Sequence, residues 1–307
     1  MAINRRIPAD HGLTVRIFIT GLLMVVLYAL VIGILFAVGL NLGVILVIAG
    51  VFLFCQYWFS DKIALFGMHG RIVTPEQEPE LHGIIDRLCA LADMPKPRVA
   101  VADVDMPNAF ATGRNPKNAV VCATRGIMRR LDEPELEAVL AHEISHVAHR
   151  DVAIMTIASF LGMVAGLITR FTIYAGVFGG FGGGDNQSGQ NAALVEIGVI
   201  VVSALIYAIS FLLTMALSRY RELAADRSGA ILIGRPSLLA SALVKVTGEM
   251  SRIPTRDLRS AEHFNAFYFT PALAKGTSLS SLFSTHPPLQ KRLDQLAKLE
   301  AEMNQPG

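Results

Sequence analysis

Charged residues are scarce in this chain of 307 residues. They make up 17% of the sequence, against about a quarter in soluble domains, while hydrophobic residues make up 52% and the mean hydropathy is positive. The net charge is only +2, and the sequence has no basic block with interleaved aromatic residues, which argues against a nucleic-acid partner. The composition therefore indicates a membrane protein.

Cysteine is also rare. The three cysteines, Cys55, Cys89 and Cys122, are an odd and scattered set without a CxxC pair. Such a set does not make a disulfide framework, so we expect the part of the chain outside the bilayer to face a reducing compartment.

A cleavable signal peptide is not evident either. The first apolar run, residues 17–40, is longer than a signal-peptide core, and no small-residue cleavage site follows it. Further runs at 42–59, 152–169 and 197–217 approach the roughly 20 residues that a spanning helix needs, so four transmembrane helices are predicted. The third run contains glycines and is followed by Arg170, which leaves open a re-entrant segment and a total of two spans.

Positive charges indicate which way these runs cross the membrane. Basic residues stand before the first run and after the second run of the first pair: Arg5, Arg6, Arg16, Lys62 and Arg71. Neither the turn inside that pair nor the Gly-rich linker 179–189 inside the second pair carries Lys or Arg. Because these residues concentrate on the cytoplasmic side, we expect both termini in the cytoplasm and linker 179–189 outside.

The most informative motif lies between the two pairs of runs, at His142-Glu143-Ile144-Ser145-His146. Residues four apart share one face of a helix, so both imidazoles can point at one metal ion. Glu143 lies beside them and is able to take a proton from water. Two histidines that hold Zn²⁺ and a carboxylate that acts as a base are the arrangement of zinc hydrolases.

The surrounding sequence predicts that this motif lies in a helix. Asp132 is a candidate cap, Glu135 follows three residues later, and Pro134 falls in the first turn, where proline is tolerated. Apolar residues then recur at helical spacing, at Leu136, Val139, Leu140, Ile144 and Val147.

Two histidines leave zinc short of a protein ligand. Glu222 and Asp226 are four residues apart, so one carboxylate could bind metal while the other orients a ligand histidine. Spacing alone leaves equally open that they are surface acids flanked by arginines. It also leaves open whether Asp151 stays solvated or hydrogen-bonds within the site, whereas His149 is expected to be structural.

Four stretches, 107–116, 140–146, 221–226 and 284–289, together resemble one family. In motif order and hydrophobic layout the chain is similar, over nearly its whole length, to the HtpX-type membrane zinc metalloproteases, relatives of the CAAX prenyl proteases. The resemblance implies a mainly α integral membrane protein with about four transmembrane helices. It also implies a cytosolic α+β zincin-like (gluzincin) protease domain with a small β-sheet.

This reading divides the chain into four parts. Residues 1–60 are expected to form a transmembrane hairpin, and 61–151 the first half of the zinc protease domain with the histidine motif. Residues 152–217 are expected to form the second transmembrane pair with its Gly-rich outside loop, and 218–307 the second half with the third ligand. Short-strand patterns in the first half and helical patterns in the second agree with an α+β domain.

The resemblance also assigns roles to single residues. The family's third zinc ligand maps to Glu222, which would complete a site with His142 and His146 for one Zn²⁺ per chain. Asp226 would be the hydrogen-bond partner of a ligand histidine, and Glu143 the catalytic base.

Two further assignments rest on the same resemblance. Asn108, Ala109, Phe110 and Ala111 match the family's substrate-binding edge strand, whose free backbone can pair with an extended peptide. The alternative is a plain core strand. His286 matches a histidine near zinc that is suited to stabilise the oxyanion at the scissile carbonyl. The alternative is a helix-start histidine held by the two prolines that follow it.

The resulting hypothesis is a membrane-bound zinc endopeptidase. It would hydrolyse membrane or misfolded proteins at the cytoplasmic face of a bacterial inner membrane, as quality control under stress. Its partners would be polypeptides and the lipid bilayer. One alternative is a zinc ion that only staples the soluble halves, but structural sites usually use four Cys or His ligands, and Cys89 and Cys122 lack ligand spacing. Another is a transporter, which would need charged residues near mid-bilayer that the four runs do not have.

Overall fold

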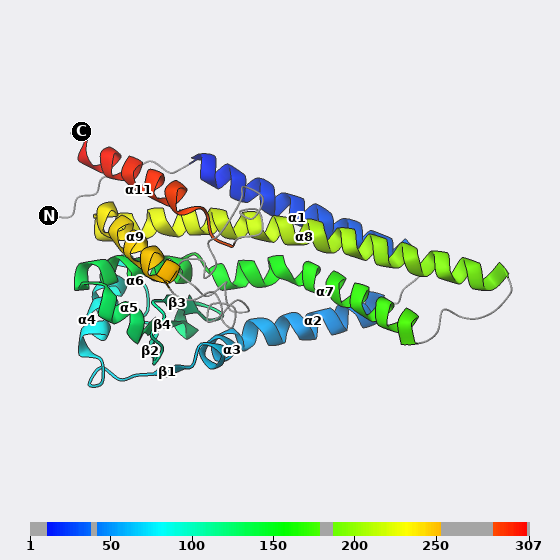
Figure 1. Ribbon diagram of the computed structural model, residues 1–307, viewed down its shortest axis with the longest axis horizontal. Helices are drawn as coiled ribbons and strands as arrows, with labels where there is room; N and C mark the ends of the chain where they lie inside the picture. The colour runs from blue at the N-terminus through cyan, green and yellow to red at the C-terminus, as the bar shows by residue number, and fades with distance from the viewer. Residues whose placement is uncertain (1–10, 38–41, 179–186, 253–284, 306–307) are drawn as a thin grey trace.

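The computed structural model describes residues 11–37, 42–178, 187–252 and 285–305. Long helices run away from a compact end that holds the sheet and the shorter helices (Figure 1). The long helices are α1 (His11–Ala37), α2 (Leu42–Trp58), α7 (Asp151–Phe178) and α8 (Gln187–Ile233). The shorter ones are α3 (Ser60–Gly67), α4 (Pro79–Ala92), α5 (Arg125–Arg130), α6 (Glu133–Ala148), α9 (Pro236–Arg252) and α11 (Leu289–Asn304). Most of the predicted outside linker 179–189 lies outside the described residues.

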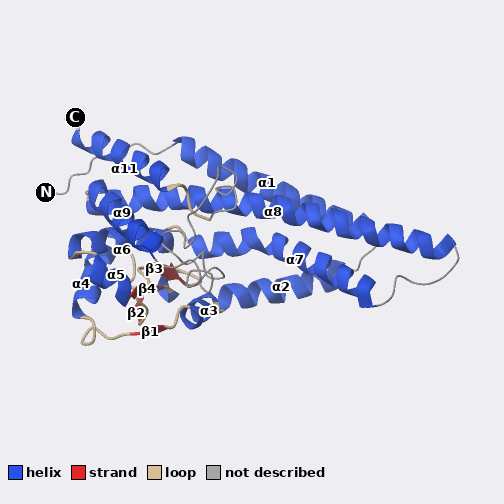
Figure 2. Ribbon diagram, viewed as in Figure 1, coloured by secondary structure: helices blue, strands red, loops and turns tan. Residues whose placement is uncertain are grey.

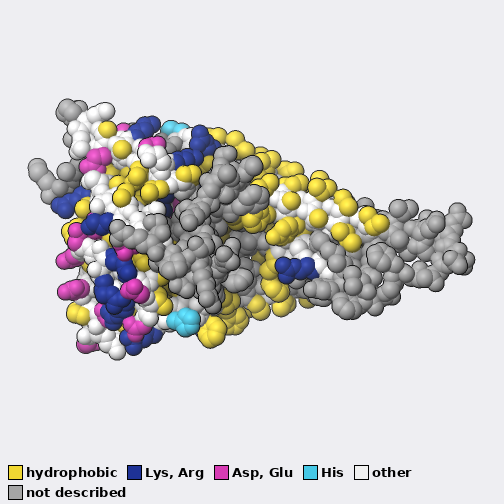
Figure 3. Space-filling view, in the orientation of Figure 1, with side chains coloured by type: hydrophobic (Ala, Val, Ile, Leu, Met, Phe, Trp, Pro, Cys, Tyr) yellow, Lys and Arg dark blue, Asp and Glu magenta, His cyan; other side chains and the backbone are white. Residues whose placement is uncertain are grey.

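Within the described residues, two helices are by length and composition able to cross a bilayer, in the segments His11–Val31 and Ile197–Ile233. The first part of α7, Asp151–Gly166, meets the same test only together with α6, and the two are bent by 65° at the break between them. Apolar side chains on the long helices face outward (Figure 3), with Phe18 69% and Leu205 57% exposed, as expected of helices in contact with lipid. A helical integral membrane protein is therefore confirmed, and the total of four spans stays a prediction.

The compact end contains a four-stranded mixed sheet with the order β1-β2-β4-β3 (Figure 2). Its strands are β1 (Gly70–Ile72), β2 (Arg98–Ala102), β3 (Ala109–Thr112) and β4 (Val120–Thr124). β2 and β4 are parallel, and β1 and β3 pair with them antiparallel. β4 is fully buried inside the sheet, and the predicted small sheet is confirmed. Among the residues that the structure describes, β3 pairs with β4 alone and lies at the edge of the sheet.

Helix α6 begins where the sequence predicts. The Asp132 carboxylate accepts a hydrogen bond from the backbone N–H of Glu135 (3.1 Å), and the Glu135 carboxylate accepts one from the N–H of Asp132 (3.3 Å). This reciprocal capping box satisfies two of the N–H groups that a helix start leaves free. Glu135 also accepts hydrogen bonds from Ser241 (2.7 Å) and Lys245 (2.6 Å) of α9, so the start of α6 is fixed to the second half of the chain.

Helix α6 lies at the centre of the compact end, where α4, β3, β4, α8 and α9 pack against it. One hydrophobic core contains residues from the stretch before α7 and from the stretch that begins in the last part of α8. Leu81, Val121 and Leu140 come from the first, and Leu239 and Leu296 from the second. The two stretches therefore fold as one body, although two long apolar helices separate them in sequence.

Gly229 of α8 allows this helix to approach α6 directly at the histidine motif. A β-carbon at position 229 would lie 2.8 Å from the backbone nitrogen of His142, 2.9 Å from its Cα and 3.0 Å from the carbonyl carbon of Ala141. These neighbours are backbone atoms, which cannot rotate away. The close approach brings the α8 side chains one and two turns earlier, including Glu222, level with the histidines.

We expect Gly229→Ala to lower the free energy of unfolding by about 1–3 kcal/mol, because overpacking forces backbone shifts. Thermal unfolding of the detergent-solubilised protein, followed by circular dichroism, would measure this. Gly83→Ala is the matched control, because its added β-carbon meets nothing within 4 Å in helix α4. An unchanged unfolding temperature for Gly229→Ala would show that the two helices can separate at no cost.

Candidate metal centre

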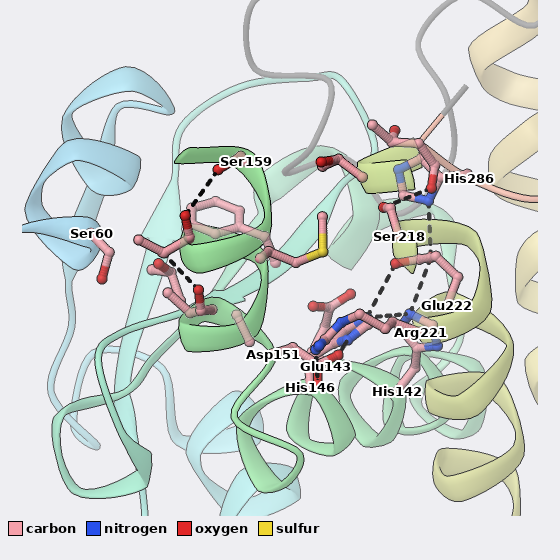
Figure 4. Close-up of a pocket in the computed structure, with 18 of the residues that line it drawn as sticks. Ser60, His142, Glu143, His146, Asp151, Ser159, Ser218, Arg221, Glu222 and His286 are labelled. Carbon is pink, nitrogen blue, oxygen red and sulfur yellow. Dashed lines mark hydrogen bonds and ion pairs between the residues drawn. The ribbon is translucent and has the colours of Figure 1, made fainter. Parts of the chain in front are cut away.

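His142 and His146 project from one face of α6 toward each other, as the four-residue spacing predicts (Figure 4). Their Nε2 atoms are 3.1 Å apart, and their rings are nearly perpendicular, with centroids 4.7 Å apart. His142 is buried and His146 nearly so. The two nitrogens that face each other are therefore placed to bind one metal ion, shielded from bulk water.

Glu222 of α8 supplies a carboxylate to the same point. Its Oε1 lies 3.4 Å from Nε2 of His146, and its Oε2 lies 3.7 Å from Nε2 of His142. Bond lengths of 2.0–2.1 Å in a tetrahedral zinc site put ligand atoms about 3.3 Å apart. Separations of 3.1, 3.4 and 3.7 Å among the three donors fit one divalent ion. Within the described ranges, no other group of His, Cys, Asp or Glu side chains forms such a cluster.

Asp226 holds the outer nitrogen of His142, one helical turn after Glu222. Its Oδ1 is 3.0 Å from Nδ1 of His142. Arg292 of α11 donates two hydrogen bonds to the same carboxylate, from Nε at 2.7 Å and from Nη2 at 2.6 Å. All three side chains are almost fully buried. Asp226 therefore orients His142 with Nε2 toward the cluster, and Arg292 orients Asp226.

Asp151 bonds the outer nitrogen of the other histidine. Its Oδ2 lies 2.5 Å from Nδ1 of His146, and its Oδ1 pairs with Nη2 of the buried Arg221. Sequence reasoning left the surroundings of Asp151 open, and the structure shows that it hydrogen-bonds within the site.

Glu143 lies between the cluster and strand β3. Burial raises the pKa of this carboxyl group to about 8. The nearby His146 and a hydrogen bond from the backbone of Ala111 both act to lower the same pKa. A cation at the cluster would favour the ionised form and lower this pKa again. Glu143 is thus close to a candidate metal and to a strand edge at the same time.

The two histidines have opposite pKa shifts. Burial lowers the pKa of His142, with Asp226 opposing, so its neutral form is favoured. Burial also acts to lower the pKa of His146, but the hydrogen bond and charge of Glu222 raise it overall. Burial acts to raise the pKa of Glu222, but the nearby His286 and His146 lower it overall. Without a metal, a protonated His146 therefore pairs with an ionised Glu222, and a bound cation would replace that proton.

His286 lies on the far side of Glu222. Its Nδ1 is 2.9 Å from Oε2 of Glu222, and the side chain is buried. The preceding residue is fixed to α8, because the hydroxyl of Ser218 donates to the carbonyl of Thr285 (2.8 Å). The structure thus brings His286 to the cluster through the carboxylate of Glu222, and its predicted role at the oxyanion stays a prediction.

A cavity of about 410 Å³ begins at the cluster and follows β3. Residues 109–112 line it on the sheet side, and the backbone before them is fixed to β4 by hydrogen bonds between Asn108 and Thr124. Beyond the cluster, the cavity continues between α7 and α8, where Met155, Thr156 and Met215 line it. The predicted strand residues therefore border the candidate site, except Asn108, which is fully buried and does not line the cavity.

The sequence pattern of one family, peptidase family M48, matches residues 75–300. The chain belongs to this family. The protein named Protease HtpX homolog 1 of Streptomyces coelicolor is 56% identical over 300 residues, which cover 98% of this chain and 97% of that protein. Protease HtpX homolog of Moorella thermoacetica is 50% identical over 302 residues, covering 98% and 99%. The resemblance to HtpX-type proteases is confirmed, and the protein is a membrane-bound metalloprotease.

A solved structure supports the fold of this M48 protease. The crystal structure of S. mikatae Ste24p superposes with a TM-score of 0.51 at 18% sequence identity, over 92% of this chain and 67% of that one. This likeness concerns the fold alone. The site of the M48 protease contains two buried arginines whose roles the sequence did not predict. Arg292 donates hydrogen bonds to Asp226 behind His142, and Arg221 forms an ion pair with Asp151 behind His146.

Proposed function

We propose that this protein is a zinc endopeptidase that cleaves membrane or misfolded proteins at the cytoplasmic face of a bacterial inner membrane. The observation that carries the proposal is the convergence of His142, His146 and Glu222 on one point with the carboxyl group of Glu143 beside it. A site with three protein donors leaves a fourth position open, which is typical of catalytic rather than structural zinc.

The residues of the chain divide the work. A bound zinc ion would supply Lewis acidity, which would lower the pKa of a water molecule bound to it into the neutral range and polarise a carbonyl group of the substrate. His142, His146 and Glu222 would hold the ion through Nε2, Nε2 and the carboxylate, while Asp226 keeps Nδ1 of His142 protonated and its Nε2 free. A carboxylate oxygen of Glu143 takes a proton from the attacking water and later gives it to the departing amine.

Substrates would bind as an extended strand along β3. An unpaired strand edge provides backbone hydrogen bonds to any sequence, and Ala111 lies where such a strand would pass Glu143. The cavity continues between α7 and α8, the helices that lead into the bilayer, so a polypeptide emerging from the membrane could reach it.

The same proposal covers the division of the chain. The stretches 61–151 and 218–307 would form the catalytic body, and 1–60 and 152–217 the membrane part. Cytoplasmic exposure of the catalytic body follows from the distribution of lysine and arginine around the apolar runs.

The test is digestion of an unfolded, carboxymethylated protein by the purified full-length chain in detergent, with and without a chelator. We expect cleavage to stop when zinc is removed and to return with added Zn²⁺, and metal analysis to find close to one zinc per chain. Stoichiometric zinc without any hydrolysis would instead favour a zinc ion that only joins the two halves.

A further inference from the structure

The chain makes a sharp turn between α6 and α7 that brings Asp151 back to the motif. Arg150 has a φ of 57°, in the left-handed region that non-glycine residues rarely adopt, and the two helices are bent by 65° at this point. On a straight helix, residues five apart lie about 140° apart around the axis, so Asp151 would point away from His146. The turn instead lets the Asp151 carboxylate reach Nδ1 of His146.

The other oxygen of the same carboxylate is held by α8. Oδ1 of Asp151 pairs with Nη2 of Arg221, the residue directly before Glu222. Asp151 is 8% exposed and Arg221 6%, so water does not compete strongly for either group. The buried carboxylate of Asp151, the first residue of α7, thus contacts Arg221 of α8 and the candidate ligand His146 (Figure 4). It links a helix of the proposed membrane part to the candidate metal site.

The arrangement repeats the one behind His142, with one difference. There, Arg292 holds Asp226, and Asp226 holds Nδ1 of His142. That group joins α6, α8 and the C-terminal helix, all within the compact end. The group behind His146 includes instead the helix α7, which leads away from the compact end beside α8 (Figure 1).

We propose that Asp151 and Arg221 form a clamp that positions His146 and makes metal affinity depend on the packing of α7 against α8. The inference rests on the proposed zinc site. Asp151 acts on His146 directly, by fixing its ring and keeping Nδ1 protonated so that Nε2 faces the ion. Arg221 acts through Asp151 by fixing the rotamer of its carboxylate. Both are positioning residues, and neither touches the substrate.

A clamp with only a structural role would behave differently from one that positions a ligand. An aspartate at a helix start stabilises the helix by interacting with its dipole, and its loss would lower stability without a specific effect on the metal. A positioning clamp would change metal affinity and the geometry at the metal. The test must therefore read the metal as well as activity.

The experiment measures zinc affinity of the full-length protein in detergent by competition with a chromophoric chelator. Asp151→Ala alone would leave Arg221 buried without a partner, which endangers the fold. The paired variant Asp151→Ala/Arg221→Met removes both charges. We expect both variants to bind zinc roughly 10–100-fold more weakly than the unmodified chain, the range found when an outer partner of a ligand is lost.

The matched control is Asp61→Ala/Arg98→Met. This pair joins α3, which follows the N-terminal helices, to strand β2 through Arg98 Nη2 and Asp61 Oδ2 at 2.5 Å, but it touches no candidate ligand. We expect its zinc affinity to stay within about two-fold of the unmodified chain, since no ligand loses its partner.

Two further readouts separate positioning from general damage. After Co²⁺ substitution, the visible absorption bands should shift in the clamp variant and stay in place in the control, because these bands report ligand geometry. With a peptide substrate, kcat should fall while KM stays close to that of the unmodified chain, because β3 is untouched.

Two outcomes would contradict the clamp or the zinc site on which it rests. If the paired clamp variant matched the unmodified chain in zinc affinity and in its Co²⁺ bands, the clamp would be refuted. The proposed function would still stand. An unmodified chain that binds no zinc would refute both.

Discussion

Replacing Glu143 with Gln is expected to abolish peptide cleavage while zinc content stays close to one per chain. Glutamine keeps the size of the side chain and can still accept the hydrogen bond from the backbone of Ala111. It cannot take a proton from the attacking water. A positioned general base contributes roughly 10²–10⁴-fold to rate, so the loss of kcat should be at least of this order.

Cleavage of the carboxymethylated substrate and metal analysis of the same preparation would measure both properties. Glu137→Gln is the matched control, because Glu137 lies on α6 but faces away from the cluster and pairs with Arg87 (2.7 Å). The control should cleave at the rate of the unmodified chain. Surviving cleavage in Glu143→Gln would mean that another group removes the proton.

The position of the motif in a helix could be predicted because the signals are local. The start of α6 depends on Asp132 and Glu135, which are three residues apart and bond to each other. The facing of His142 and His146 depends only on the helical repeat. The short strands expected in the first half of the domain are also local features, and β3 (Ala109–Thr112) is one of them.

The boundary between α6 and α7 could not be predicted in the same way. Sequence patterns place an apolar run from residue 152, but the bend depends on Arg150 adopting a left-handed conformation that its residue type disfavours. Tertiary contacts made by its neighbour Asp151 accompany that conformation. The roles of Asp151 and Arg221 behind His146 therefore appear only in three dimensions.

Arg292 is an intermediate case. In the sequence, Arg292, Leu296 and Leu299 follow the spacing of one helical face, and all three are buried. An arginine on an apolar face requires a buried acid as its partner, so the pattern contained a usable signal. That partner, Asp226, lies 66 residues away in the sequence. Its place beside Arg292 depends on how α11 packs on α8.

Replacing Glu222 with Ala is expected to remove both zinc binding and cleavage. The substitution leaves two nitrogen donors, and the loss of affinity should exceed the roughly 10–100-fold typical of removing an outer hydrogen-bond partner. Zinc affinity by chelator competition would measure it, with cleavage as the second readout. The fold itself should survive without metal, because Arg292, the buried arginine beside Glu222, keeps Asp226 as its acidic partner.

Glu302→Ala serves as the control for α8 packing, because Glu302 pairs with Arg227 of that helix at 3.6 Å and lies away from the cluster. It should bind zinc and cleave normally. If Glu222→Ala still bound one zinc, the third donor would have to be another group within reach of both histidines. His286 is the first candidate, since its Nδ1 lies 2.9 Å from the carboxylate that would be lost. The double variant Glu222→Ala/His286→Ala would then lose the ion, and the assignment of Glu222 as a ligand would be wrong.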